Sequence, residues 1–130
     1  MKKIILSVLS VFIVWSVFDF IIHGIILRSS YEATAKLWRP MGEMKMSLMY
    51  VTVLIAALAF VAIYSRFVAE KKIATGVKYG LWFGLGTGVS MGYGTYSVMP
   101  IPYLMALGWF LGSLVEATLG GLIVGLIIKE

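Results

Sequence analysis

The chain has 130 residues, of which 61% are hydrophobic and only 13% are charged. A typical soluble domain has about 45–50% apolar and about 25% charged residues, so this composition excludes an ordinary soluble protein. It also argues against disorder, which requires low hydrophobicity. The chain has no cysteine, which excludes disulfides, thiol catalysis and cysteine-ligated metal centres.

Four apolar segments are expected to cross a membrane as helices, because the length allows about four spans of ~20 residues each. The last two share a long uncharged stretch, which only Met99-Pro100-Ile101-Pro102 interrupts. Proline lacks an amide donor and disfavours a helical residue before it, so this segment predicts a tight turn. The sequence therefore predicts an all-α fold, a four-transmembrane-helix bundle forming a single domain over residues 1–130. In chain order, its helices cover about 4–27, 46–67, 75–97 and 102–128.

The basic residues indicate how these helices are oriented. Cytoplasmic loops carry an excess of Lys and Arg. If both termini lie in the cytoplasm, seven basic residues fall on the cytoplasmic side and four on the opposite side. The sequence therefore predicts a multi-pass inner-membrane protein with both termini cytoplasmic. Basic residues at helix ends also meet anionic lipid head groups, so the net charge of +5 indicates the lipid bilayer as a partner and no nucleic acid. The cytoplasmic group is Lys2, Lys3, Arg66, Lys71, Lys72, Lys78 and Lys129; the opposite group is Arg28, Lys36, Arg39 and Lys45.

The connection between the first two spans has a helix signal of its own. Ser29 is followed three residues later by Glu32, which is a capping-box pattern. This predicts a short helix over 30–38, with Tyr31 and Trp38 near the membrane interface, where such aromatic residues are enriched. The alternative is that the first helix simply extends beyond the membrane.

Small residues recur at every fourth position of the last two spans. Residues four apart share one face of a helix, and small residues let helices approach closely in lipid. The pattern predicts that the third and fourth spans pack together, although such a row could also line a pore or bind a partner helix. The number of glycines favours a further contact, in a homo-oligomer or a larger membrane complex. The packing residues are Gly80, Gly84, Gly88 and Gly92 on the third span and Ala117, Gly121 and Gly125 on the fourth.

Three ionisable side chains lie well inside the predicted spans: Asp19, His23 and Glu116. A charge at the membrane centre costs about 2.5–3.5 kcal/mol on insertion scales, so such residues are functional candidates by default. Asp19 and His23 are four apart and share a helix face, whereas Glu116 has no neutralising neighbour on its own helix. Together they predict a site that binds a proton, a cation or a cationic substrate. The alternative is that Asp19 and His23 satisfy one another and that Glu116 is protonated or hydrogen-bonded to an aromatic residue.

Methionines gather just before the second span, at Met41, Met44 and Met46. A thioether sulfur is a soft ligand that suits copper(I), but methionine also fills gaps in packed cores. The favoured interpretation has no metal and no cofactor. One histidine and no cysteine leave little from which to build a nucleophile and its base, so an enzyme is not expected.

Three segments of the chain resemble small uncharacterised four-helix bacterial membrane proteins, which are grouped as families of unknown function. The first is Phe18-Asp19-Phe20-Ile21-Ile22-His23-Gly24, which runs on to Tyr31 and Trp38. The others are the glycine-rich helix from Gly80 to Gly94 and the segment from Glu116 to Gly125. The resemblance implies a four-helix fold and no particular activity. The sequence thus favours a transport or channel-like protein, with a non-catalytic subunit of a larger membrane complex as the alternative.

Overall fold

The computed structural model describes residues 1–129, and the regular elements within that range are all helical. The all-α prediction is therefore confirmed. Two π-helical turns extend the main helices: η1 continues α1, and η4 joins α4 to α5. Two short 3₁₀ turns, η2 and η3, lie between α2 and α3. The helices are α1 (Lys2–Ile21), α2 (Arg28–Ala33), α3 (Met46–Phe67), α4 (Ile73–Val89), α5 (Thr95–Val98) and α6 (Tyr103–Ile127); the turns are η1 (Ile22–Ile26), η2 (Ala35–Leu37), η3 (Met41–Glu43) and η4 (Ser90–Gly94).

Three helices are long and apolar enough to cross a membrane, and they coincide with the first, second and fourth predicted spans. The third predicted span, 75–97, is built differently. Its α4 has 17 residues, fewer than the ~20 that a span needs, and η4 and α5 follow it without a gap. A full-length third span therefore depends on the π-helical turn. The three long helices are Lys2–Ile26, Met46–Phe67 and Tyr103–Ile127.

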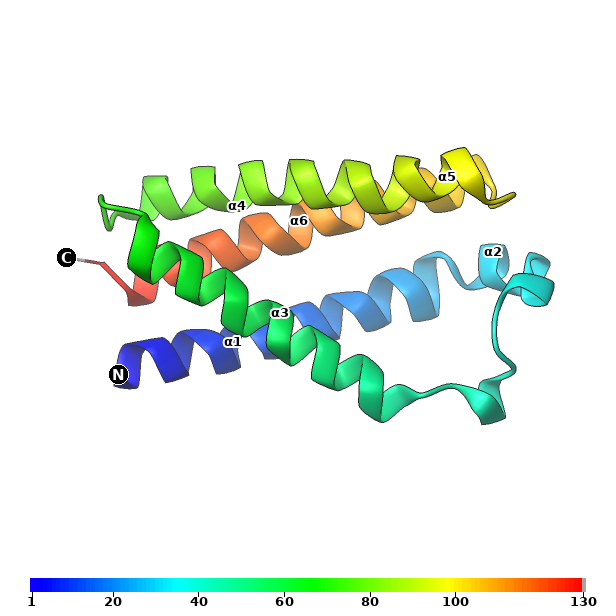
Figure 1. Cartoon of the computed structure of the whole chain (residues 1–130), viewed down its shortest axis with the longest axis horizontal. Helices are drawn as coiled ribbons and strands as arrows, with labels where there is room; N and C mark the ends of the chain where they lie inside the picture. Colours follow the sequence, from blue (N-terminus) through cyan, green and yellow to red (C-terminus); the bar gives the residue numbers. More distant parts are fainter. Residues whose placement is uncertain (130) are drawn as a thin grey trace.

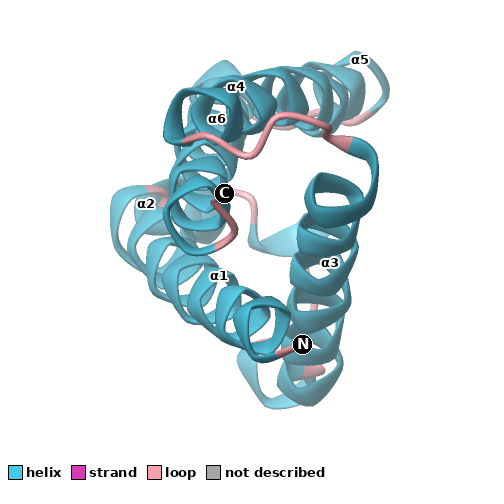
Figure 2. Ribbon diagram, turned by 90° about the vertical axis from the view of Figure 1, so that its left-hand side faces the viewer, coloured by secondary structure: helices cyan, strands magenta, loops and turns pink. Residues whose placement is uncertain are grey.

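α4 and α6 run along the long axis of the molecule and α3 slants across α1, and the molecule has two distinct ends (Figure 1). The start of α1 and the end of α6 lie at one end, called the terminal end below. The segments α2 and α5 lie at the other, called the loop end. α4 and α6 run side by side, and α1 contacts both α6 and α3. Viewed along the axis, the α4–α6 pair, α1 and α3 occupy three corners (Figure 2).

Two apolar clusters hold the helices together, one on each side of the middle of the α1–α6 interface. The first, toward the terminal end, joins α1, α3 and α6. The second, at the loop end, joins the start of α6 to the segment around α2. The first contains Val11, Trp15, Ala57, Phe60, Val61, Tyr64 and Val124; the second contains Ile101, Met105 and Ala106, with Tyr31, Leu37, Trp38, Met99 and Trp109 packed against them.

The backbones of α4 and α6 touch directly because glycines line their interface. A methyl group at Gly80 would overlap the backbone oxygen of Ala117, and one at Gly121 would overlap that of Gly76. A Cβ at Gly84 would lie 2.9 Å from the Cβ of Ala117. Any larger residue would force the helices apart. Three further glycines face the partner helix in the same way: Gly88, Gly92 and Gly125.

The helix predicted over 30–38 is wrong in its bounds, and the capping box is absent. α2 begins directly after Leu27, and no side chain caps its start. Glu32 pairs instead with Arg28, with 3.1 Å between Oε1 and Nε. The physical reason is that η1 carries the path of α1 as far as Ile26, so α2 starts without the free helix end that a capping box would satisfy.

Candidate functional site

Large side chains of α1, of η1 and of the residue that follows η1 pack on glycines of α6. A Cβ added to each glycine would lie 2.8–3.2 Å from the opposing side chain. The three contacts are Trp15 on Gly120, Ile22 on Gly112 and Leu27 on Gly108. In an antiparallel pair the residue numbers rise along one helix as they fall along the other. Asp19 lies between Trp15 and Ile22, so this register places it opposite Glu116, which lies between Gly120 and Gly112. The positions 108, 112, 116 and 120 are spaced four apart on α6, and Glu116 is the one residue among them that is not glycine.

The carboxyl groups of Asp19 and Glu116 meet at this position. The side chain of Asp19 lies close enough to that of Glu116 to interact with it, and the indole of Trp15 donates a 2.7 Å hydrogen bond to the backbone oxygen of Glu116. Oε1 of Glu116 is shielded from solvent and has no hydrogen-bond partner among residues 1–129. The side chain of Asp19 is 29% exposed. The pair therefore combines one sheltered oxygen, on Glu116, with one partly exposed side chain, that of Asp19.

The arrangement of the two carboxyl groups favours the binding of a proton or another cation. Two neighbouring carboxylates repel one another, which favours a shared proton or a bound cation. An unpaired buried acceptor costs about 1–3 kcal/mol, so a proton or cation at Oε1 of Glu116 would relieve that cost. The site is thus suited to binding and releasing positive charge.

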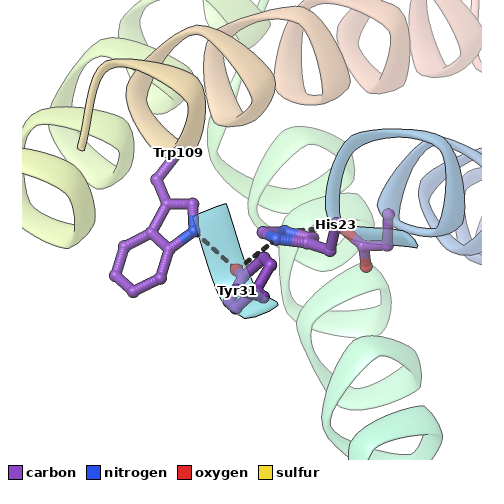
Figure 3. A network of polar contacts seen from close by, with 4 residues as sticks. His23, Tyr31 and Trp109 are labelled. Carbon is purple, nitrogen blue, oxygen red and sulfur yellow. Dashed lines mark hydrogen bonds and ion pairs between the residues drawn. The ribbon is translucent and has the colours of Figure 1, made fainter. Parts of the chain in front are cut away.

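His23 extends the acidic pair toward the loop end (Figure 3). Its Nε2 lies 4.0 Å from Oδ1 of Asp19, and its Nδ1 lies 2.6 Å from the hydroxyl oxygen of Tyr31. His23 belongs to the π-helical turn η1, a distortion that is frequent at functional sites. The structure therefore brings the three ionisable candidates together, in the order Glu116, Asp19, His23.

Tyr31 and Trp109 complete the network, although the sequence analysis assigned neither to the site. The indole Nε1 of Trp109, on α6, donates a 2.7 Å hydrogen bond to the hydroxyl of Tyr31, on α2. Burial raises the pKa of Tyr31 to about 12; the hydrogen bond from Trp109 lowers it, and the charge of Asp19 raises it further. Tyr31 therefore stays a neutral phenol at physiological pH. Its ring stacks edge-on against Trp38, with the ring centres 5.4 Å apart.

The methionines proposed as copper ligands lie at exposed positions near the loop end. Met41, in η3, is 83% exposed, whereas Met44 and Met46 are 39% and 46% exposed. Copper binding there stays an untested alternative to the favoured interpretation, which has no metal. Within residues 1–129, no three His, Asp or Glu side chains are arranged so that they could hold a metal ion.

Comparison of the chain with protein-family models, curated proteins and solved structures finds no match. Any function must therefore be inferred from the geometry of Asp19, His23 and Glu116 and from the apolar character of the long helices.

Proposed function

We propose that this chain is a small, non-catalytic inner-membrane protein that carries a proton or another cation across the bilayer through an intramembrane site. Asp19 and Glu116 form the binding site, and His23 links it to the loop end. The helical path through α4, η4 and α5 serves as the third span and so completes a bundle of four. Both termini face the cytoplasm, in accord with the bias of Lys and Arg toward the terminal end.

One observation carries this proposal: a carboxyl group with an unpaired, shielded oxygen beside a second carboxyl group in a helix–helix interface. Intramembrane ionisable residues are rare and mark ion pathways and proton relays. A purely structural role for Glu116 would be served better by glycine, because the rest of its row is glycine and packs closely on α1. The carboxyl therefore interrupts good packing, which favours a functional reason for its presence.

The test is ion movement by the purified protein in lipid vesicles. An imposed membrane potential supplies the driving force, and dyes trapped inside report the pH and the alkali-cation concentration. We expect vesicles with the protein to equilibrate an ion faster than protein-free vesicles. Asp19→Asn should slow the flux, since it removes one of the two charges that hold the ion.

Glu43→Gln is the matched control, because Glu43 is an exposed acidic residue in η3, at the loop end and outside the site. Its flux should equal that of the wild type. Proton and cation fluxes no faster than those of protein-free vesicles would refute the proposed function.

A second candidate function, as a subunit of an oligomer or larger complex, is favoured by an open small-residue face on α4 and η4. No heavy atom lies within 4 Å of a Cβ built at Gly86 or at Gly94, and Ser90, midway between them, is exposed. Small residues at this spacing suit close helix–helix contact in lipid. The protein that co-purifies in mild detergent distinguishes a fixed partner from further copies of this chain.

A further inference from the structure

Polar side chains form a line from Trp109 through Tyr31 to His23 (Figure 3), with Asp19 beyond the imidazole. Trp109 Nε1 lies 2.7 Å from the Tyr31 hydroxyl, which lies 2.6 Å from His23 Nδ1. His23 Nε2 lies 4.0 Å from Asp19 Oδ1, a gap that one bridging water or a small rotation of the imidazole closes. The line runs along two turns of α6, because Trp109 and Glu116 are seven residues apart on that helix.

The donor and acceptor chemistry of these groups decides which nitrogen of His23 carries the proton. Tryptophan can only donate a hydrogen bond, so Trp109 occupies a lone pair of the Tyr31 oxygen. If neutral His23 instead donated from Nδ1 to Tyr31, the lone pair of Nε2 would face the carboxylate of Asp19. Neutral His23 therefore accepts from Tyr31 at Nδ1 and carries its own proton on Nε2, toward Asp19.

We propose that the ion carried by this protein is a proton, and that it passes between the loop end and the Asp19–Glu116 pair through Tyr31 and His23. This inference rests on the proposed function and names its substrate and route. In each transfer, Tyr31 gives its hydroxyl proton to Nδ1 and takes a replacement from a hydronium ion at the loop end, which is left as water. His23 then releases its Nε2 proton to Asp19, so the Nε2–H bond breaks, the Oδ1–H bond forms, and no electron is transferred. The imidazole is left with its proton on Nδ1, and it returns to the Nε2–H form when water takes the Nδ1 proton and supplies one to Nε2.

The donor set of the site favours a proton over a metal ion. Once Nδ1 is bonded to Tyr31 and Nε2 carries hydrogen, two carboxyl groups are left, whereas cations such as Ca²⁺ or Mg²⁺ take about six oxygen ligands. A proton needs only alternating donors and acceptors. The groups that contact His23 suit this role: they are Asp19 on α1 and Tyr31 on α2, and Glu116 on α6 lies beyond Asp19. The nearest basic residue along the chain, Arg28, is paired with Glu32 on the exposed side of α2.

The first test is the protonation state of the imidazole nitrogens, and it does not depend on transport. The chain has a single histidine, so the imidazole ¹⁵N resonances all belong to His23 and only its two ring nitrogens have to be told apart. At a pH where His23 is neutral, we expect Nε2 to be protonated and Nδ1 to be an unprotonated, hydrogen-bonded acceptor. In Tyr31→Phe the Nδ1 signal should move to the position of a nitrogen without a hydrogen bond. A proton on Nδ1 in the wild type would overturn the proposed route.

The second test is proton flux into vesicles. Tyr31→Phe should reduce it by about tenfold or more, since a positioned proton-transfer group has been removed. Tyr103→Phe is the matched control: Tyr103 also bonds a tyrosine, the hydroxyl of Tyr93 at 3.1 Å, but lies outside the relay. Its flux should be unchanged.

The outcomes separate the two proposals. If wild-type vesicles move alkali cations without protons, or if proton flux is the same in Tyr31→Phe, the relay is wrong and the proposed function stands. If no ion moves, both are wrong.

Discussion

Replacing Gly80 with leucine should prevent α4 from packing on α6. Even the Cβ of the new residue would overlap the backbone oxygen of Ala117, and a backbone atom cannot rotate out of the way as a side chain can. The helices must separate, and the neighbouring glycine contacts loosen with them. We expect a loss of roughly 3 kcal/mol or more, the upper end of the range for overpacked cores, with a lower unfolding temperature in detergent.

Gly86→Leu is the matched control, because it adds the same side chain to the same helix at a site with no heavy atom within 4 Å. Its stability should change by no more than about 0.5 kcal/mol, as for ordinary surface substitutions. Equal unfolding temperatures for the two variants would show that the α4–α6 contact does not form in the protein.

Trp15→Ala should be the most damaging substitution on α1. Trp15 is 8% exposed, and its ring meets that of Phe60 edge-on, with the ring centres 5.2 Å apart. It also lies against Gly120 and bonds the backbone oxygen of Glu116. In lipid, removing the ring loses little free energy of transfer, because the ring faces an apolar medium in the separated helix as well. The cavity alone should cost about 3 kcal/mol, the lower end for such truncations.

Trp15→Phe separates packing from hydrogen bonding. It keeps an aromatic ring but loses the indole donor, so thermal unfolding in detergent should show a loss of about 1 kcal/mol. Because Trp15 lies one turn from Asp19, this variant should also weaken the register that holds Asp19 opposite Glu116. Equal stability of Trp15→Ala and the wild type would contradict the three-helix core.

Much of the fold can be predicted from the apolar runs and from the spacing of small residues in the sequence. The second span was predicted at 46–67 and α3 has those bounds, because charged residues flank an unbroken apolar run. The contact between α4 and α6 follows from small residues at four-residue spacing. The π-helical turn η4 has no such signal, so the third span was expected as one regular helix.

The candidate site was only partly predictable. Asp19 and Glu116 stand out as ionisable residues in apolar runs. Counted at ~1.5 Å per residue along the predicted helices, however, they lie at different depths, ~12 and ~21 Å from the loop end. The actual register is set by bulky residues of α1 and of the segment that follows it on Gly108, Gly112 and Gly120. A signal was present, because Glu116 interrupts that row of glycines.

The contact of Tyr31 with Trp109 had no comparable signal. It depends on the π-helical turn η1 and on the direction in which α2 leaves α1. The periodicity of the sequence encodes neither feature. The sequence placed Tyr31 only at the membrane interface, and the structure adds its partners.

The most direct test of the intramembrane acidic site is ion flux through Glu116→Gln in lipid vesicles, measured beside the wild type. This substitution keeps the shape of the side chain and removes its charge, so the protein should fold normally. If Glu116 holds the transported ion, the flux should fall to the level of protein-free vesicles while the unfolding temperature stays close to that of the wild type. A folded Glu116→Gln variant with wild-type flux would contradict the account and leave Glu116 as a structural residue of the α1–α6 interface.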